Sequence, residues 1–155
     1  MEDQSAPILT QAKREYTSQL VSILTPQIFD GLKSIYDESK IVCSSSYNKQ
    51  SLLDCFRGFL EKVPEWSQVI IETETDRIIQ MSKCDWLDDL ITAVFISHTK
   101  ILTSIGNNSD AQIDLTIPKT INFIHKCYIN IAREIWKNPY LYNENVLGSE
   151  YQQNM

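Results

Sequence analysis

The sequence predicts an all-α protein: a single-domain helical bundle of five or six helices with a long central helix. The first reason is composition, since 43% of the 155 residues are hydrophobic and 22% are charged, as in ordinary globular domains. The second is the small number of turn residues, 4 glycines and 5 prolines, which leaves little turn chemistry for many short strands. The third is an apolar periodicity of helical spacing that recurs along the chain. A chain of this length buries enough surface for one core.

The clearest periodicity lies in the stretch CDWLDDLITAVFISHTKILTSI, in which we predict the central helix over residues 85–105. At about 100° per residue, apolar side chains and His98 fall on one face, while aspartates, threonines and Lys100 fall on the other. The residues on the apolar face are Leu87, Leu90, Ile91, Val94, His98, Ile101, Leu102 and Ile105. The same spacing directs Tyr16, Ile70 and Met81 of earlier helices inward.

Two helices are predicted near the N-terminus, over residues 10–24 and 26–42, after an N-terminal arm at residues 1–9. We place the break between them at Thr25-Pro26. A Thr side chain can cap a helix by accepting a backbone N–H, and Pro is favoured at the first helical position, where no N–H is needed.

A third helix is predicted over residues 49–62, after a run of serines that favours a loop. Gly58 in its interior costs about 1 kcal/mol relative to Ala, which indicates a close helix crossing at that point. The helix after Pro64 carries Glu74 in its apolar face. Arg77 lies three residues further on and is the natural partner for that carboxylate.

The last helix is predicted over residues 118–137, with its apolar stripe facing the central helix. The preceding IDLTIP, residues 113–118, alternates apolar and polar side chains, as a short extended segment would. The helical domain therefore covers residues 10–138, and residues 139–155 form a C-terminal arm without periodicity.

The charge and the cysteines restrict the function. A net charge of -6 and a pI of 4.9 argue against bulk binding to nucleic acid or to an anionic membrane. No apolar run approaches the roughly 20 residues that cross a bilayer, so no membrane span is expected, and no secretory signal is predicted at the N-terminus. The four cysteines lack CxxC spacing, and we interpret them as free thiols in a reducing compartment.

Residues with the chemistry of an active site are present but do not form a known motif. His98 is interpreted as a structural side chain, since no nucleophile motif accompanies it. The spacing of Cys84, His98, His125 and Cys127 gives no support to a zinc site. The sequence contains no Gly-rich phosphate loop, GxSxG or HExxH. We therefore expect no enzymatic activity, no cofactor, no metal and no catalytic residues.

The most specific sign of partner binding in the sequence is a basic face on the last helix. Its four cations share one side of the helix, opposite the apolar stripe, and aromatic residues flank its end. The predicted partner-binding residues are Lys119, Lys126, Arg133, Lys137, Trp136, Tyr140 and Tyr142. The competing interpretation is a solvated helix surface, which charges at this spacing usually form.

Residues 59–142 resemble a family of small uncharacterised proteins of nucleocytoplasmic large DNA viruses, especially mimivirus-like and marseillevirus-like giant viruses. The run AVFISHTKILTSI and the ending KNPYLY carry the resemblance most specifically. The resemblance implies a viral protein that is made in the host cytoplasm and is either packaged in the virion or used in its assembly. It implies no catalytic residues.

Together these observations predict a non-enzymatic interaction protein, a minor capsid or core component of a large DNA virus. The expected partners are other viral structural proteins, and a homo-oligomer is left open. The alternative is an accessory factor of viral DNA replication or transcription that binds nucleic acid through the basic face.

Overall fold

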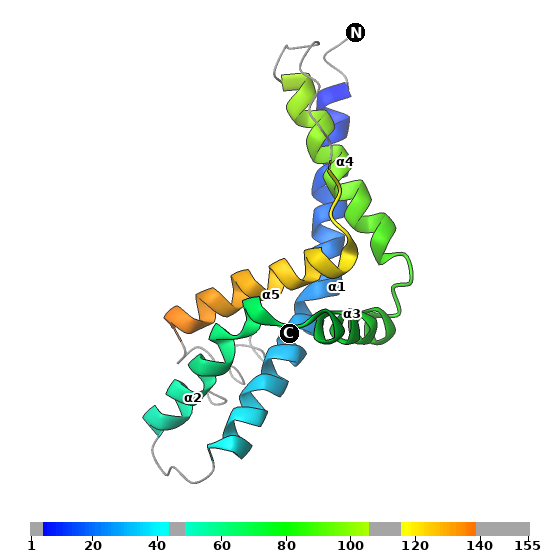
Figure 1. The fold of residues 1–155 in the computed structure, drawn as a ribbon. Helices are drawn as coiled ribbons and strands as arrows, with labels where there is room; N and C mark the ends of the chain where they lie inside the picture. The colour runs from blue at the N-terminus through cyan, green and yellow to red at the C-terminus, as the bar shows by residue number, and fades with distance from the viewer. Residues whose placement is uncertain (1–4, 44–48, 106–115, 139–155) are drawn as a thin grey trace. The chain divides into compact units, whose positions relative to one another are not determined.

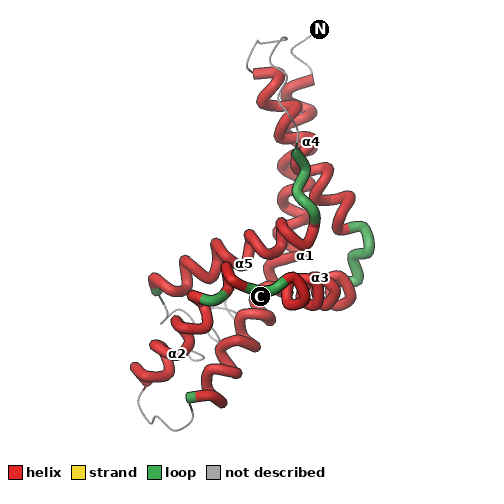
Figure 2. Tube along the Cα trace, viewed as in Figure 1, coloured by secondary structure: helices red, strands yellow, loops and turns green. Residues whose placement is uncertain are grey.

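The computed structural model describes residues 5–43, 49–105 and 116–138. In these three ranges the protein is all-α, with five α-helices, a short 3-10 helix and no strand (Figure 1, Figure 2). The helices are α1 (Ser5–Val42), α2 (Lys49–Glu61), η2 (Val63–Glu65), α3 (Gln68–Ser82), α4 (Leu87–Ile105) and α5 (Thr120–Lys137). The predicted all-α class is confirmed. The extended segment predicted at 113–118 lies largely outside the described residues, and residues 116–119 have no regular structure.

The chain divides into two compact units, each built from two separate stretches of sequence. The first unit comprises residues 1–27 and 73–123, and the second comprises residues 28–72 and 124–155. The divisions fall inside α1, α3 and α5, so each of these helices contributes to both units.

Helix α1 is one continuous helix, so the predicted break at Thr25-Pro26 is wrong. Residues 5–9 of the predicted N-terminal arm belong to this helix, and residues 1–4 lie outside the described residues. The helix begins at Ser5 and contains Pro26 in its interior. An interior proline removes one backbone hydrogen bond and costs about 3 kcal/mol. A buried side chain at every fourth position continues across the proline and offsets this cost. These side chains are Leu20, Leu24, Ile28, Leu32 and Tyr36.

In the first unit, the buried face of α4 includes Leu87, Leu90 and Ile91, as predicted, but His98 is exposed. Ser97 is buried in its place and donates its hydroxyl to the carbonyl oxygen of Ala93 at 2.8 Å. Around the helix axis His98 lies between the directions of Leu87 and Ile91, which are both buried about two to three turns earlier. The buried arc therefore shifts toward Ser97 in the second half of α4, and His98 and Leu102 are exposed there.

Three other side chains predicted to face inward are exposed: Tyr16, Ile70 and Met81. In α3 Ile71, predicted on the same face, is buried. Ile70 and Met81 lie at the edge of that face, because a helix needs only a stripe of about 100° to pack. Tyr16 lies in line with the buried stripe of α1, one turn before its first buried member, Leu20.

The predicted pair of Glu74 and Arg77 is confirmed within the first unit. Arg77 donates to the carboxylate of Glu74 through Nε at 2.8 Å and through Nη2. Nη2 also donates to the backbone carbonyl of Gln27 in α1 at 2.7 Å. Both side chains are only partly exposed, so the guanidinium neutralises a half-buried carboxylate and joins α3 to α1.

Gly58 in α2 does not mark a close helix crossing, contrary to the prediction. A Cβ atom built at this position meets no atom within 4 Å, and the residue does not have a positive φ. Because alanine loses less backbone entropy in a helix than glycine, Gly58→Ala should raise the free energy of unfolding by about 1 kcal/mol. Urea denaturation of the two proteins measures this change, and a destabilised variant would contradict the open space found here.

Candidate functional site

The surface with the most organised polar and aromatic contacts lies in the second unit, where α2 and η2 meet α5. Near its start, α5 is tied to η2 by His125, whose Nε2–H donates to the carbonyl oxygen of Val63 at 2.8 Å. A carbonyl can only accept, so Nε2 carries the hydrogen. Trp66 stacks on the His125 ring with 6.1 Å between centroids and also contacts buried Tyr128 at 5.1 Å. His125 therefore has a structural partner on an adjacent element.

Near its end, α5 is tied to α2 through Trp136. The indole Nε1–H of Trp136 donates to Oε1 of Glu61 at 3.0 Å. Arg57 donates through Nε to the backbone carbonyl of Trp136 at 3.2 Å, and its guanidinium lies 5.2 Å from the centroid of the indole ring. The carbonyls of the last helical turn lack partners within the helix, so Arg57 satisfies one of them. These contacts fix the orientation of an aromatic ring that is still 41% exposed.

Between these two anchors lies a groove of about 330 Å³. One face of α5, with side chains at spacings of three and four residues, forms one wall, and α2 and η2 form the other. Its lining residues are Leu60, Glu61, Pro64, Ile129, Ala132, Arg133, Trp136 and Lys137. Leu60 and Ala132 are buried and form the floor, whereas the charged side chains and Trp136 are exposed at the rim.

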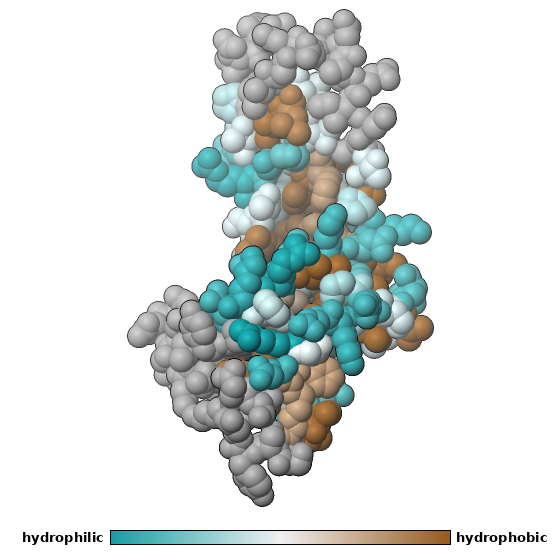
Figure 3. All heavy atoms as spheres, turned by 60° about the vertical axis from the view of Figure 1, so that its left-hand side comes forward, coloured by the Kyte–Doolittle hydropathy of each residue, from teal (hydrophilic) through white to brown (hydrophobic). Residues whose placement is uncertain are grey.

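The predicted partner-binding residues can now be placed. Lys126, Arg133 and Lys137 lie on α5 with exposed side chains, and exposed Lys119 directly precedes that helix. Lys137 pairs with Glu134 at 3.2 Å. Figure 3 shows hydrophilic residues over much of the middle of the visible surface, with smaller hydrophobic areas between them. Tyr140 and Tyr142 lie outside the described residues, and the binding role of the whole set stays a prediction.

The groove brings three of the predicted residues, Arg133, Trp136 and Lys137, together with side chains that the sequence did not indicate. The missed lining residues are Leu60, Glu61 and Pro64, and the missed residue that holds Trp136 from α2 is Arg57. They lie more than 60 positions before their neighbours on α5, and nothing in their local pattern distinguishes them from other amphipathic helix residues. Only the packing of α2 against α5 shows their relation.

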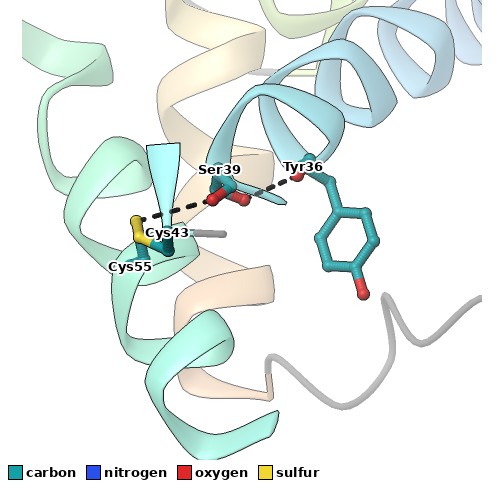
Figure 4. The surroundings of a disulfide bond; sticks show 4 residues. All are labelled: Tyr36, Ser39, Cys43 and Cys55. Carbon is teal, nitrogen blue, oxygen red and sulfur yellow. Dashed lines mark hydrogen bonds between the residues drawn. A yellow bond between two sulfur atoms is a disulfide. The ribbon is translucent and has the colours of Figure 1, made fainter. Parts of the chain in front are cut away.

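A disulfide between Cys43 and Cys55 corrects the prediction of four free thiols. It joins the end of α1 to α2, with 6.7 Å between the two Cα atoms (Figure 4). Next to it, buried Ser39 donates its hydroxyl to the carbonyl oxygen of Tyr36 at 2.6 Å. The carbonyl oxygen of Ser39 accepts the N–H of Cys43 at 2.9 Å and lies 3.8 Å from Sγ of Cys55. The spacing of 12 residues resembles no disulfide motif, so only the pairing of the two helices brings the cysteines together.

The other two cysteines, Cys84 and Cys127, are free thiols. Burial raises the pKa of the Cys84 thiol; a backbone hydrogen bond from Trp86 opposes this shift and the charge of Asp85 reinforces it. Burial also raises the pKa of Cys127. A raised pKa keeps a thiol protonated at neutral pH, and the protonated form is a poor nucleophile and metal ligand.

The described residues contain neither a metal-binding cluster nor a membrane-spanning helix. No three His, Cys, Asp or Glu side chains of residues 5–43, 49–105 and 116–138 lie close enough together to hold a metal ion. In the same part of the chain, no helix combines the length and the apolar composition needed to cross a bilayer. The best-defined candidate site in the described structure is the groove beside α5, because its lining and the contacts that hold Trp136 are known residue by residue.

These observations define the class: an all-α protein of two compact units whose candidate site is a surface groove rimmed by charged and aromatic side chains. The chain belongs to DUF5764, a family of unknown function, whose family model matches residues 6–143. No curated protein and no solved structure matches it.

Proposed function

We propose that this protein is a non-enzymatic interaction protein that serves as a minor structural or assembly component of a viral particle. The observation that carries the interaction role is the exposed surface of α5. There Trp136 is held by Glu61 and Arg57, and Arg133 and Lys137 lie beside it. Rigid Trp and Arg side chains dominate the binding energy of protein interfaces. Such a surface is suited to adhesion more than to the conversion of a substrate.

The assignment to a particle is supported by the viral resemblance of residues 59–142 and by the disulfide between Cys43 and Cys55. Disulfides are rare in the cytosol, where thiols are kept reduced, but they persist in oxidising surroundings such as virion surfaces. The disulfide therefore fits a mature particle better than a protein that stays in the host cytoplasm after assembly. The proposed partners are other structural proteins of the particle, or further copies of this chain.

The test is mass spectrometry of purified particles combined with lysine-reactive crosslinking. We expect the chain in the particles, with crosslinks from Lys137 at the rim of the groove to another structural protein. Absence from the particles would remove the structural role.

Nucleic-acid binding is the alternative, and the exposed cations of α5 favour it. A mobility-shift assay with DNA and RNA over a range of salt concentrations separates the two functions. Salt-dependent binding that is lost in the Lys126→Glu/Arg133→Glu protein would support the alternative and contradict our proposal.

A further inference from the structure

We propose that the groove between α2 and α5 binds a segment of a partner protein that presents an aliphatic side chain next to a carboxylate. The groove would be the contact site of the interaction role proposed above, on which this assignment rests. Its floor, its rim charges and its fixed aromatic side chain each specify part of the partner's chemistry.

The floor of the groove specifies an aliphatic group. Leu60 and Ala132 are each 2% exposed, and half-buried Ile129 and the ring of Pro64 extend the apolar lining. A volume of about 330 Å³ lies at the lower end of the range for pockets that enclose small ligands, roughly 300–1,000 Å³. An aliphatic side chain that enters the groove leaves water and gains contacts on several sides.

The rim of the groove specifies a carboxylate. Lys137 already pairs with Glu134, and Glu61 accepts the indole N–H of Trp136. Arg133 has no carboxylate partner among the residues that the structure describes. A guanidinium at the edge of an apolar groove can hold a carboxylate by two parallel hydrogen bonds, so Arg133 is the expected partner of an acidic residue.

The same rim disfavours a polyanion such as nucleic acid. The cations Arg133 and Lys137 are accompanied by the carboxylates of Glu61 and Glu134, so the local charge nearly cancels. The chain as a whole carries a net charge of -6. A phosphate backbone needs several cations in a row, and here it would also meet carboxylates. A short peptide with one carboxylate placed at Arg133 avoids that repulsion.

Trp136 adds a preorganised wall. Its ring is held by a hydrogen bond from Nε1 to Glu61 and by the guanidinium of Arg57 over the ring, and it is still 41% exposed. A side chain that is already held in its bound orientation loses little conformational entropy when a partner docks. The wall next to Arg133 is therefore ready for binding without rearrangement of α5.

The test is a titration of the purified full-length chain with capped tetrapeptides, followed through the indole N–H resonance of Trp136 by NMR. The probe is acetyl-Glu-Leu-Leu-Glu-amide, and its two controls replace the leucines by serines or the glutamates by lysines. We expect the probe to shift the resonance in a saturable way and both controls to leave it unchanged. The serine control removes the aliphatic group and the lysine control reverses the charge.

Two charge reversals on α5 provide a matched pair. Arg133→Glu should weaken binding of the probe by at least about tenfold, whereas Lys126→Glu should change it by less than about twofold. Both residues are exposed on the same helix and undergo the same change of charge, but only Arg133 lines the groove. Thermal melts of the two variants establish that both remain folded.

Three results would overturn the proposal. Equal weakening by the two charge reversals would mean general electrostatic attraction, and no shift with any of the peptides would mean that the groove does not accept this chemistry. A shift that grows with protein concentration in the absence of peptide would mean that a second copy of the chain fills the groove. None of these results depends on viral particles, so this experiment and the test of the structural role fail separately.

Discussion

Replacing Cys43 by serine is expected to lower the free energy of unfolding by about 3 kcal/mol, because the bond to Cys55 closes a loop in the unfolded chain. The two cysteines are separated by 12 positions. For a chain of this size, a loss of this magnitude lowers the melting temperature by about 6–12 °C. The Cys55→Ser protein should lose the same amount. A thermal melt or a urea titration without reductant measures the effect.

Reduction provides the matched control for this prediction. Dithiothreitol should destabilise the natural protein to the level of the two serine variants and leave those variants unchanged. In the reduced protein the thiol of Cys55 can donate to the carbonyl oxygen of Ser39, which lies 3.8 Å away. The local packing is thus retained, and the main loss is the constraint on the unfolded chain. The prediction would be contradicted if the unfolding midpoint of the natural protein did not respond to dithiothreitol, or if its intact mass corresponded to four free thiols.

The sequence predicted those features of the fold that depend on a repeating pattern. The apolar spacing of α4 and α5 placed both helices within a few residues, and the spacing of Glu74 and Arg77 predicted their ion pair. The prediction of two helices around Pro26 is wrong, because the buried stripe that crosses the proline outweighs its local tendency to end a helix. The periodicity of α4 likewise predicts a buried His98, because it lies between the directions of Leu87 and Ile91, but the buried arc turns toward Ser97 in the second half of the helix.

The candidate site was predictable only in part. The cations of α5 are visible as a stripe in the sequence, because they lie on one helix. The groove is not visible, because Leu60, Glu61 and Pro64 come from elements that precede α5 by more than 50 residues. The same limit applies to the disulfide of Cys43 and Cys55. Contacts between helices depend on packing geometry, which a single sequence without a motif does not specify.

The second large effect is expected from Phe56→Ala, which should lower the free energy of unfolding by about 3–5 kcal/mol. Phe56 has an exposed fraction of 0%, and its ring meets that of Tyr36 edge to face, with 5.2 Å between centroids. Such an aromatic pair contributes about 0.5–1.5 kcal/mol beyond the burial of its surface. The variant therefore loses both the buried area and the ring contact between α1 and α2, and it leaves a cavity.

Phe59→Ala is the matched control, because Phe59 lies on the same helix and undergoes the same change of side chain but is only half-buried. Phe59→Ala should lower the free energy of unfolding clearly less than Phe56→Ala. Equal losses in urea titrations of the two variants would contradict the packing seen at Phe56.

The disulfide remains intact in Phe56→Ala, so reduction of that variant should lower its free energy of unfolding by about 3 kcal/mol more. The two effects should add, since the disulfide acts mainly on the unfolded chain and Phe56 acts on the folded core. A much smaller loss on reduction would show that the junction of α1 and α2 had already opened without its aromatic pair, and that the disulfide depends on this packing for its contribution.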